Sequence, residues 1–322
     1  MNSILTTLDA ISVPYTIIGA PKPEGGREGP ALSVVLLNRG SRLYRGEALD
    51  ELERVGLGAV LSIESRPDSL DLLTDRHPGA RFLILSRPAS PGLQIDLGMR
   101  ESPGRFVFVL WSDMALSAQG LSSRFFERLD ERDMLCQAPA LFAKGGEQLP
   151  SAISPAFSRS PASSRAGLKV LGLVPAKDGA KSLFPYDYAG IYSREKFVLS
   201  GGFDPILSNP YWQKLDFGFR AWLWGEEIRV AQALKVSYAE EPAAEDESAD
   251  ECYKWFWLKN LAPSFHGDSG AVSASRFWSY LRSRRGGALS ALGEFRAARE
   301  WVRTNRYRFR TDATSLVDLW DE

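Results

Sequence analysis

The sequence has few of the residues that soft metal sites and disulfide frameworks require. It contains two cysteines, Cys136 and Cys252, two histidines, His77 and His266, and four methionines in 322 residues. Zinc modules need several cysteine or histidine ligands close together, and disulfide-stabilised domains need several pairs of cysteines. The scarcity excludes both classes and most multi-histidine centres. Any bound metal is therefore expected to be a hard ion with oxygen ligands.

An excess of charge of either sign is absent as well. Lysine and arginine total 39, aspartate and glutamate total 40, and the formal net charge is -1. Such a balance does not indicate a nucleic-acid partner. No stretch approaches the roughly 18 uninterrupted apolar residues of a membrane span, and residues 1–15 lack the basic and apolar regions of a secretory signal. Two cysteines in a chain without a signal are expected to be reduced thiols, so we expect a cytoplasmic protein.

The first half of the chain has the pattern of an α/β domain. Residues 21–30 are rich in proline and glycine, which predicts a connector that closes an N-terminal extension over 1–30. The predicted strands cover 33–37, 59–63, 81–86 and 106–110, and the predicted helices between them cover 46–55, 69–76 and 93–100. This alternation is typical of a parallel sheet covered by helices, which binds ligands at the carboxyl ends of its strands. The residues at those ends are Asn38, Glu64, Ser86 and the run Trp111-Ser112-Asp113.

The second half alternates less regularly. The predicted elements are a mobile Ser/Pro/Gly-rich loop over 143–166, a strand over 170–174, a helix over 211–224, and short strands over 228–231 and 234–238. Residues 240–251 carry seven acidic side chains and no basic one, which predicts a solvated loop. Residues 276–310 carry ten arginines and two glutamates on predicted amphipathic helices. We therefore expect one domain over 31–262 and a basic helical C-terminal extension over 263–322.

Six short motifs occur in a fixed order along the chain. They are Ser33–Arg39, Val60–Ser65, Pro91–Gly98, Phe106–Asp113, the Gly-Gly-Phe-Asp run 201–204, and Gln213–Arg220. Their order and spacing resemble glycosyltransferase family 2, the nucleotide-sugar transferases with the GT-A fold, over roughly residues 32–259. The resemblance implies a Rossmann-like, mixed and mostly parallel sheet flanked by helices, with a helical C-terminal extension beyond it.

The resemblance also implies a site for a nucleotide diphosphate sugar at the strand ends. Asp113 matches the metal-binding aspartate that ends the family's Asp-x-Asp motif, and it would hold Mg²⁺ or Mn²⁺ against the diphosphate. Trp111 stands where the family has the first aspartate of that motif. Glu64 matches the acid that contacts the base or the ribose. The other donor-binding candidates are Asn38, Asp96, Ser112, Gly201 and Gly202. The alternatives are a helix cap for Asp113 and an exposed strand-end acid for Glu64.

Transfer with inversion requires a base that takes the proton of the acceptor hydroxyl. In the family this base is the aspartate of a Glu-Asp pair, and the matching positions here are Gln213-Lys214. The candidate catalytic residues are therefore Asp216, two positions further on, and Asp204. Helical spacing turns Asp216 about 200° away from the family's position, which favours instead an ion pair with Arg220. The alternative bases are Asp187 and Glu195.

These features predict a transferase that moves a sugar from a nucleotide diphosphate sugar to a cell-envelope, glycan, lipid-linked or protein acceptor, with metal assistance. Trp111 and Lys214 favour a second hypothesis, a catalytically silent relative that binds a nucleotide sugar or a partner protein. A nucleotidyltransferase of the same fold is a third, weakened by the lack of a Gly-rich loop with a trailing lysine. The basic helices over 276–310 predict either peripheral contact with an anionic membrane at the inner face or a solvated cap. His266 is a possible further metal ligand.

Overall fold

The computed structural model describes residues 13–21, 32–40, 42–65, 70–117, 121–158, 167–242, 244–283 and 288–320. Residues 1–12 and 22–31, which include most of the predicted N-terminal extension and its connector, lie outside the described residues. In chain order the elements of the first half are β1 (Tyr15–Gly19), β2 (Leu32–Leu37), α1 (Arg42–Val55), β3 (Ala59–Glu64), α2 (Leu70–Arg76), β4 (Arg81–Leu85), α3 (Pro91–Glu101), β5 (Phe106–Trp111), β6 (Met114–Leu116), α4 (Ser123–Glu131), β7 (Cys136–Phe142) and β8 (Ala152–Phe157).

The second half begins with a strand that pairs with β8. Its elements are β9 (Leu168–Leu173), the 3₁₀ turn η3 (Tyr186–Tyr188), β10 (Gly190–Ser193), α5 (Arg194–Leu199), α6 (Pro210–Leu223), β11 (Ile228–Tyr238), α7 (Glu251–Phe256), the π-helical turn η4 (Trp257–Leu261), β12 (Ser264–His266), β13 (Ser269–Ala271), α8 (Arg276–Ser283), α9 (Ala288–Asn305), η5 (Arg306–Arg308) and α10 (Ala313–Asp318).

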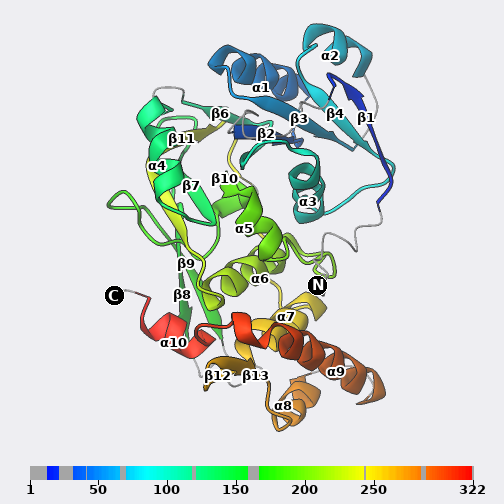
Figure 1. Ribbon diagram of the computed structural model, residues 1–322, viewed down its shortest axis with the longest axis vertical. Helices are drawn as coiled ribbons and strands as arrows, with labels where there is room; N and C mark the ends of the chain where they lie inside the picture. Colours follow the sequence, from blue (N-terminus) through cyan, green and yellow to red (C-terminus); the bar gives the residue numbers. More distant parts are fainter. Residues whose placement is uncertain are drawn as a thin grey trace.

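A nine-stranded sheet in the order β1-β4-β3-β2-β5-β10-β7-β11-β6 forms the centre of the molecule (Figure 1). The neighbours β4, β3, β2 and β5 are parallel, and β7 and β11 form a second parallel pair. β10 joins the two groups by antiparallel pairing on both sides, and β1 and β6 are antiparallel edge strands. The predicted mixed and mostly parallel sheet is confirmed. Because β1 pairs with β4, residues 15–19 of the predicted extension belong to this sheet.

The strand order reverses between β2 and β5. The chain continues from β2 to β3 and β4 on one side, whereas β5 pairs with the other side of β2. Such a reversal opens a crevice at the carboxyl ends of the strands. Leu37 pairs with Trp111, so the residues that follow β2 and β5 leave the sheet side by side. β10 runs in the opposite direction and begins at Gly190, opposite Val109, which brings the preceding turn η3 to the same edge.

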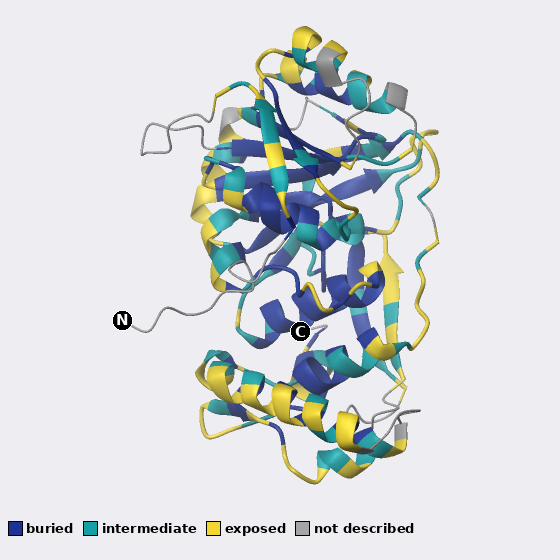
Figure 2. Ribbon diagram, turned by 90° about the vertical axis from the view of Figure 1, so that its right-hand side faces the viewer, coloured by how far each residue is buried: buried dark blue, intermediate teal, exposed yellow. Residues whose placement is uncertain are grey.

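Burial explains why these segments form strands and helices. β2 and β5, with the sequences LSVVLL and FVFVLW, are buried along their whole length. Continuous apolar runs are typical of parallel strands that helices cover on both faces. Figure 1 shows α1 and α2 on one side of these strands and α3 on the other, and Figure 2 shows the strands as the most buried layer. α3 begins at a cap in which the Ser90 side chain accepts from the Leu93 N–H.

A second apolar core joins α6 to the C-terminal helices. Leu215 and Phe219 of α6 belong to one buried cluster with Phe256 of α7 and with Ala298 and Val302 of α9. Figure 1 shows these C-terminal helices packed together at the end of the molecule opposite α1 and α2. The predicted helical C-terminal part is therefore confirmed. Within the described part of the chain, no helix is both long and apolar enough to cross a membrane.

Two predictions for the middle of the chain are wrong. The predicted loop over 143–166 contains β8, which pairs with β9 to form a separate two-stranded sheet. Residues 159–166 lie outside the described residues. The two predicted strands over 228–238 are one strand, β11, whose pairing with β7 shifts register between Ala231 and Lys235. A β-bulge keeps the strand continuous but breaks the alternation of its side chains, which accounts for the wrong boundary.

Gly218 allows α6 to pack closely against the backbone of Leu183, in the segment between β9 and η3. A Cβ atom at this position would lie 2.3 Å from the carbonyl oxygen of Leu183, which is backbone and cannot move away cheaply. We expect Gly218→Ala to lower the free energy of unfolding by about 1–3 kcal/mol, as overpacked cores do. Gly293 of α9 is the matched control, because a Cβ there meets no atom within 4 Å. Gly293→Ala should raise the stability by about 1 kcal/mol through helix propensity. Urea denaturation measures both, and equal effects would contradict the packing argument.

Candidate functional site

Ser112 ties the ends of β2 and β5 together. Its hydroxyl accepts from the backbone N–H of Arg39 at 3.2 Å and donates to the Arg39 carbonyl at 3.0 Å. Its own N–H donates to the carbonyl of Leu37 at 2.8 Å. The Ser112 side chain, a predicted donor-binding group, is thus buried and engaged with the backbone. It fixes the position from which the Arg39 side chain extends.

The Arg39 side chain lies between two carboxylates. Its Nε donates to Oδ2 of Asp113 at 2.7 Å, and its Nη2 lies 2.7 Å from Oδ2 of Asp187. The guanidinium carbon is 4.5 Å from the ring centroid of Trp111 and 5.8 Å from that of Tyr238. Burial opposes the charge of Arg39, but the two carboxylates outweigh it and raise its pKa above the usual value. Asp113, the predicted metal ligand, is therefore paired with a cation of this chain. It precedes a strand, β6, so the alternative of a helix cap is wrong.

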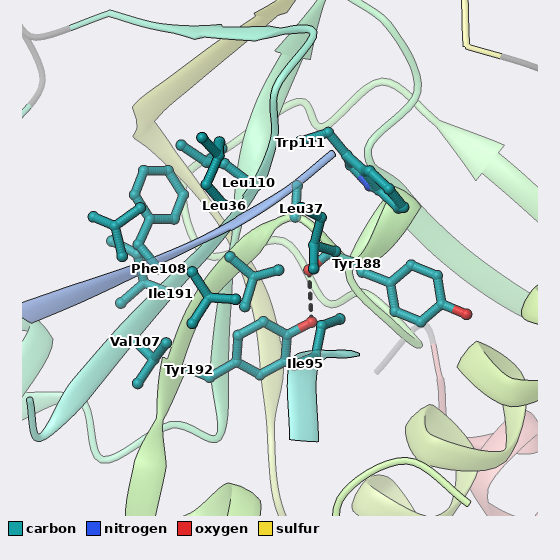
Figure 3. Packing of buried hydrophobic residues seen from close by; sticks show 14 of the residues in the cluster. Leu36, Leu37, Ile95, Val107, Phe108, Leu110, Trp111, Tyr188, Ile191 and Tyr192 are labelled. Carbon is teal, nitrogen blue, oxygen red and sulfur yellow. Dashed lines mark hydrogen bonds between the residues drawn. The ribbon is translucent and has the colours of Figure 1, made fainter. Parts of the chain in front are cut away.

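Trp111 fixes the turn that carries Asp187. Its Nε1 donates to the Asp187 carbonyl at 2.8 Å, and the hydroxyl of Tyr238 lies 3.2 Å from Oδ2 of the same residue. Asp187 has a φ of 53°, in the left-handed region that few residues other than glycine adopt. Figure 3 shows Trp111 at the end of its strand, near Tyr188, whose carbonyl accepts from the Tyr192 hydroxyl at 2.7 Å. The conformation of Asp187 is thus held by contacts on both sides.

Glu64 is buried beside Asn38, with 1% of its surface exposed. Its Oε1 accepts from the Ser62 hydroxyl at 2.7 Å and from Nδ2 of Asn38 at 3.1 Å, and its Oε2 pairs with Arg45. Burial raises the pKa of Glu64 in spite of these partners. Both oxygens are occupied, and the alternative of an exposed acid is wrong. Oδ1 of Asn38, by contrast, is buried and has no hydrogen-bond partner among the described residues.

Asp96 holds the Gly-Gly-Phe-Asp turn from behind. It is fully buried in α3, and its Oδ1 accepts from the Phe203 N–H at 3.1 Å. Gly201 and Gly202 have φ values of 87° and 65°, and a Cβ on Gly202 would lie 2.5 Å from Oδ1 of Asp96. Glycine is therefore required at that position. Burial raises the pKa of Asp96 well above its ordinary value, only partly offset by the Phe203 hydrogen bond. Of the predicted donor-binding residues, Gly201 and Gly202 thus form the turn and Asp96 holds it in place.

Gln213 joins α6 to the start of α3. Its Oε1 accepts from the N–H of Gly92 at 3.0 Å, and its Nε2 donates to the carbonyl of Leu207 at 3.0 Å. The hydroxyl of Tyr188 lies 3.1 Å from the same Oε1. A glutamate at this position would lack the N–H donor that Leu207 receives. The amide therefore has a structural reason to replace the acid expected from the resemblance.

Lys214, at the position of the expected base, is buried among aromatic rings. Its Nζ lies 5.2 Å from the ring centroid of Tyr188, 5.6 Å from that of Phe184 and 5.7 Å from that of Tyr186. Cation–π contacts of this kind stabilise a desolvated ammonium group. The ammonium group also forms an ion pair with Glu245. The residue expected to be an anion is thus a cation, and it holds a carboxylate that comes from another part of the chain.

Glu245 belongs to the acidic segment, residues 240–251, which lies beside α6. The side chain of Asn209 donates to the Asp246 carbonyl at 3.1 Å, and Nε1 of Trp212 donates to the Ser248 carbonyl at 2.7 Å. The predicted solvated loop is confirmed for residues 244 and 246–249, which are exposed, whereas the Glu245 side chain is only 22% exposed and pairs with Lys214 of α6. Residue 243 is outside the described residues.

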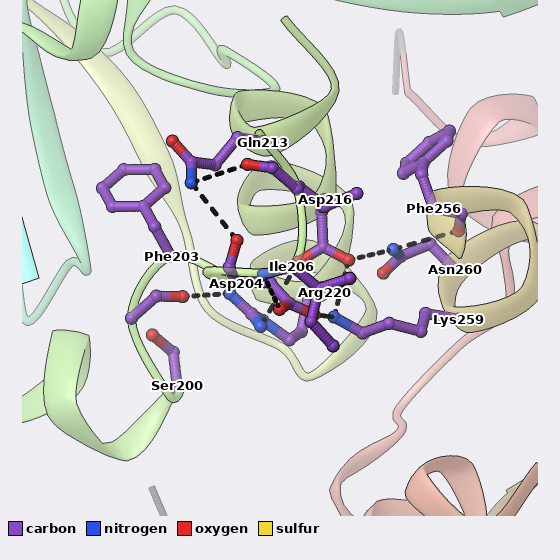
Figure 4. Close-up of polar contacts among 12 residues, drawn as sticks. Ser200, Phe203, Asp204, Ile206, Gln213, Asp216, Arg220, Phe256, Lys259 and Asn260 are labelled. Atoms are coloured by element: carbon purple, nitrogen blue, oxygen red, sulfur yellow. Dashed lines mark hydrogen bonds and ion pairs between the residues drawn. The ribbon is translucent and has the colours of Figure 1, made fainter. Parts of the chain in front are cut away.

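Asp204 and Asp216, the predicted catalytic residues, belong to a buried ion cluster around Lys259 (Figure 4). The ammonium group of Lys259 is 2.7 Å from Oδ2 of Asp204 and 2.9 Å from Oδ1 of Asp216. Asn260 donates to Oδ1 of Asp216 at 2.7 Å, and Nη1 of Arg220 lies 3.3 Å from its Oδ2. Asp216 has no exposed surface, so an acceptor hydroxyl cannot reach it in this structure. The expected ion pair of Asp216 with Arg220 is present, and we interpret the cluster as structural.

The other predicted site residues lie apart from one another. Asp187 is at the carboxyl edge of β5, beside Arg39. Glu195 follows Ser193, which pairs with Phe106 at the opposite end of β5, and it is exposed there. His266 is exposed at the end of β12, among the C-terminal helices. The structure thus brings Asn38, Glu64, Ser112, Asp113 and Asp187 to one edge, and leaves Glu195 and His266 elsewhere.

A pocket of about 560 Å³ adjoins this edge. Tyr186 and Tyr238 line it, and the Tyr238 ring centroid is 5.8 Å from the Arg39 guanidinium carbon. The remaining lining comes from residues 143–150 and 239–242. Its charged lining residues are Lys144, Glu147, Glu240 and Glu241. A pocket with two aromatic rings and an excess of carboxylates favours a hydroxyl-rich ligand over an anionic one.

Comparison with solved structures places this geometry in a known fold. The crystal structure of GalNAc-T7 with UDP, GalNAc and Mn²⁺ aligns over 91% of this chain and 56% of its own, with a TM-score of 0.54 and 12% identity. The crystal structure of S. aureus TarS aligns over 90% of this chain and 46% of its own, with a TM-score of 0.50 and 14% identity. Both are GT-A glycosyltransferases. The chain has the GT-A glycosyltransferase fold. It spans about half the length of these two structures.

Sequence comparison adds no closer relative. No protein-family model matches the chain, and no curated protein sequence matches it.

The residues at this edge do not fit a divalent cation of the kind present with GalNAc-T7. Mg²⁺ and Mn²⁺ prefer several oxygen ligands, yet Oδ2 of both Asp113 and Asp187 is engaged by the Arg39 guanidinium. Oδ1 of Asp113 is buried without a hydrogen-bond partner among the described residues, so a metal ion would have to bind beside a guanidinium that already neutralises both acids. Within those residues, no three Asp, Glu, His or Cys side chains lie close enough together to hold a metal ion.

Three residues that engage the predicted ones are absent from the candidates predicted from the sequence, namely Arg39, Tyr238 and Glu245. The sequence places Arg39 in a strand-end motif, Glu245 in a solvated loop and Tyr238 at the end of a strand. The available signals were the Asn-Arg pair directly after β2 and the dense run of acids after β11. Neither signal identifies a partner, because each of these side chains meets residues far away in the chain.

Proposed function

We propose that the protein is a glycosyltransferase that moves a sugar from a nucleoside diphosphate sugar to a glycan, lipid-linked or protein acceptor. The observation that carries this proposal is that the pocket lined by Tyr186 and Tyr238 adjoins Arg39 and its two carboxylates, Asp113 and Asp187, at the reversal of strand order. Ligands of open α/β sheets bind at that place. In the reaction the acceptor oxygen attacks the anomeric carbon, the bond to the diphosphate oxygen breaks, and the anomeric configuration inverts.

The donor side of the proposal rests on Asn38 and Arg39. Oδ1 of Asn38 is a buried acceptor without a partner among the described residues, and it suits a ring N–H of a nucleotide base. The Arg39 side chain keeps 27% of its surface exposed while Nε and Nη2 face carboxylates, and we place a phosphate oxygen of the donor against the exposed part. Glu64 and Ser112 then act as positioning residues, because their hydrogen bonds hold Asn38 and Arg39 in place.

The acceptor side rests on the pocket. Tyr186 and Tyr238 offer ring faces to a sugar, and the carboxylates of Glu147, Glu240 and Glu241 accept hydrogen bonds from its hydroxyls. Only Lys144 among the charged lining residues opposes them. This excess of negative charge favours an uncharged glycan over an anionic acceptor.

We place the proton acceptor of the reaction at Glu245. Lys214 stands where the resemblance predicts an aspartate, and its ion pair sets the Glu245 carboxylate beside that position. The side chain of Glu245 is 22% exposed, unlike that of Asp216, so an acceptor hydroxyl can reach it. Asp187 is less suited to this role, because Arg39 and Tyr238 both engage its Oδ2.

A catalytically silent nucleotide-sugar-binding protein is the second candidate function. The observation that favours it is Lys214 itself, since an ammonium group cannot take the acceptor's proton. The two candidates share the donor site and differ in turnover alone.

Donor binding tests both candidates. Thermal unfolding of the full chain with UDP-, GDP- and dTDP-sugars should show an increase in Tm with one nucleotide class. A ligand at about 100 times its Kd stabilises the folded state by about 2.7 kcal/mol, which is a shift of several degrees. No shift with any of these donors would contradict both functions. Release of nucleoside diphosphate from the donor that binds would support the transferase, and binding without release would support the silent protein.

We also propose that the C-terminal helices contact an anionic membrane surface. Four arginines, Arg296, Arg299, Arg303 and Arg306, and one acid, Glu300, which pairs with Arg303, line one hollow of about 480 Å³. Trp278 is 62% exposed on the neighbouring α8. Basic side chains together with an exposed indole are typical of surfaces that bind at the headgroup level. Such contact would suit a lipid-linked acceptor.

A further inference from the structure

This edge departs from the family pattern in two related ways. Trp111 replaces an aspartate, and Arg39 binds the carboxylates of both Asp113 and Asp187. The expected motif would place one aspartate at the last residue of β5 and a second two residues later, but the first position is Trp111, whose ring centroid lies 4.5 Å from the Arg39 guanidinium carbon. An indole face attracts a planar organic cation and gives a metal ion no lone pair. The second carboxylate at this edge comes instead from Asp187, whose carbonyl is held by the Trp111 N–H.

The positive charge at this edge is therefore supplied by the chain. A divalent cation in a carboxylate site neutralises the acids and leaves charge for the phosphates. Here the Arg39 guanidinium serves both acids, because its Nε is 2.7 Å from Oδ2 of Asp113 and its Nη2 is 2.7 Å from Oδ2 of Asp187. The Ser112 hydroxyl fixes the backbone of Arg39. A metal ion could bind both carboxylates only after Arg39 had left, because two cations at that distance repel one another strongly.

We propose that the Arg39 guanidinium occupies the position of the divalent cation at the donor edge and excludes a metal ion from the Asp113–Asp187 pair. The consequence, which rests on the proposed function, is that the nucleoside diphosphate ligand binds without a metal. Arg39 then has two tasks, to neutralise the carboxylates and to present its exposed part to a phosphate oxygen. Its affinity for the carboxylates comes from direct hydrogen bonding and from stacking on Trp111.

A titration with Mn²⁺ alone, followed by electron paramagnetic resonance on the full chain, tests the exclusion without any nucleotide. The wild-type protein should bind no stoichiometric Mn²⁺ at millimolar concentrations. Arg39→Ala should gain one site at least tenfold tighter than any in the wild type, because both carboxylates become available. Arg39→Ala combined with Asp113→Asn should lose this site, and Arg39→Lys, which keeps the charge, should not gain it. A single Mn²⁺ site in the wild type that Asp113→Asn removes would overturn the proposal, and this outcome requires only a folded wild type and one nearly isosteric variant.

The consequence for the ligand is measured separately. The Kd of the wild type for UDP, or for the nucleotide class that binds, should agree within twofold in EDTA and in Mn²⁺. A tenfold or greater tightening by Mn²⁺ would overturn the metal-independent binding. If no nucleotide binds at all, the proposed function fails, yet the Mn²⁺ titration still decides whether Arg39 excludes the metal.

Discussion

Replacement of Lys259 by methionine should lower the free energy of unfolding by about 3–5 kcal/mol. The ammonium group of Lys259 is fully buried, and it is the shared partner of the carboxylates of Asp204 and Asp216. Methionine fills much of the same space but leaves two buried acids with a weaker cationic partner, Arg220, which lies 3.3 Å from Asp216. Removal of one member of a buried ion cluster is costly because the remaining charges stay desolvated. Urea denaturation at pH 7 measures the loss.

The matched control for this substitution is Lys254→Met, in α7, the helix that precedes Lys259. Lys254 pairs with Glu251, whose side chain is 69% exposed, so the loss should stay below about 1 kcal/mol. Equal losses in the two variants would show that the buried cluster contributes no more than a surface pair.

The pH dependence of the free energy of unfolding, compared between the wild type and Lys259→Met, distinguishes the loss of charge from the loss of packing. Burial by itself would raise the pKa of Asp204, but the charge and hydrogen bond of Lys259 overcome it and lower the pKa from 3.8 to about 2. A carboxylate with a lowered pKa in the folded state stabilises the protein above its unfolded pKa, and this contribution is lost as the pH falls. The wild type should therefore lose about 2 kcal/mol from this group between about pH 4 and pH 2. Lys259→Met should lose less, so the difference between the two proteins should shrink on acidification.

The sheet could be predicted from sequence where burial leaves a simple pattern. β2 and β5 are apolar runs because both of their faces are covered, and their boundaries follow directly from the run. β8 was missed because it contains Pro155 and lies in a Ser/Pro-rich stretch, and its partner β9 is largely exposed. The bulge in β11 likewise interrupts the pattern without ending the strand. Local composition therefore describes buried parallel strands well and solvent-facing hairpins poorly.

The candidate site was predictable only in part, because its side chains meet across the sheet. The strand-end rule identified Asn38 and Asp113, since the direction of parallel strands fixes where their ends lie. The partner of Asp113 depends on the antiparallel course of β10, which brings Asp187 to the same edge. The carboxylate near Lys214 depends on how the acidic segment lies on α6. Neither contact leaves a periodic signal, so both required the structure.

If the transferase function holds, Glu245→Gln should reduce turnover by a factor of about 10²–10⁴, the usual contribution of a positioned base. The substitution keeps the size of the side chain and a hydrogen-bond acceptor for Lys214, but it removes the charge that takes the acceptor's proton. Donor affinity should change little, because Glu245 pairs with Lys214, whereas the proposed donor-binding groups Asn38 and Arg39 are held by Glu64 and Asp113. Glu247→Gln, an exposed acid of the same acidic segment, is the matched control and should leave turnover within twofold.

Two measurements decide whether the loss reflects chemistry or folding. The thermal midpoint tests folding, because the ion pair with buried Lys214 also contributes to stability, and Glu245→Asp offers a variant that keeps the charge one methylene shorter. The kinetic constants test the chemistry, since loss of a base that acts only in the transfer step should lower kcat and leave the KM for the donor unchanged. Turnover of Glu245→Gln equal to that of the wild type would exclude Glu245 as the proton acceptor. Turnover that remains in Glu245→Gln but disappears in Asp187→Asn would move the role to Asp187, the other carboxylate at this edge.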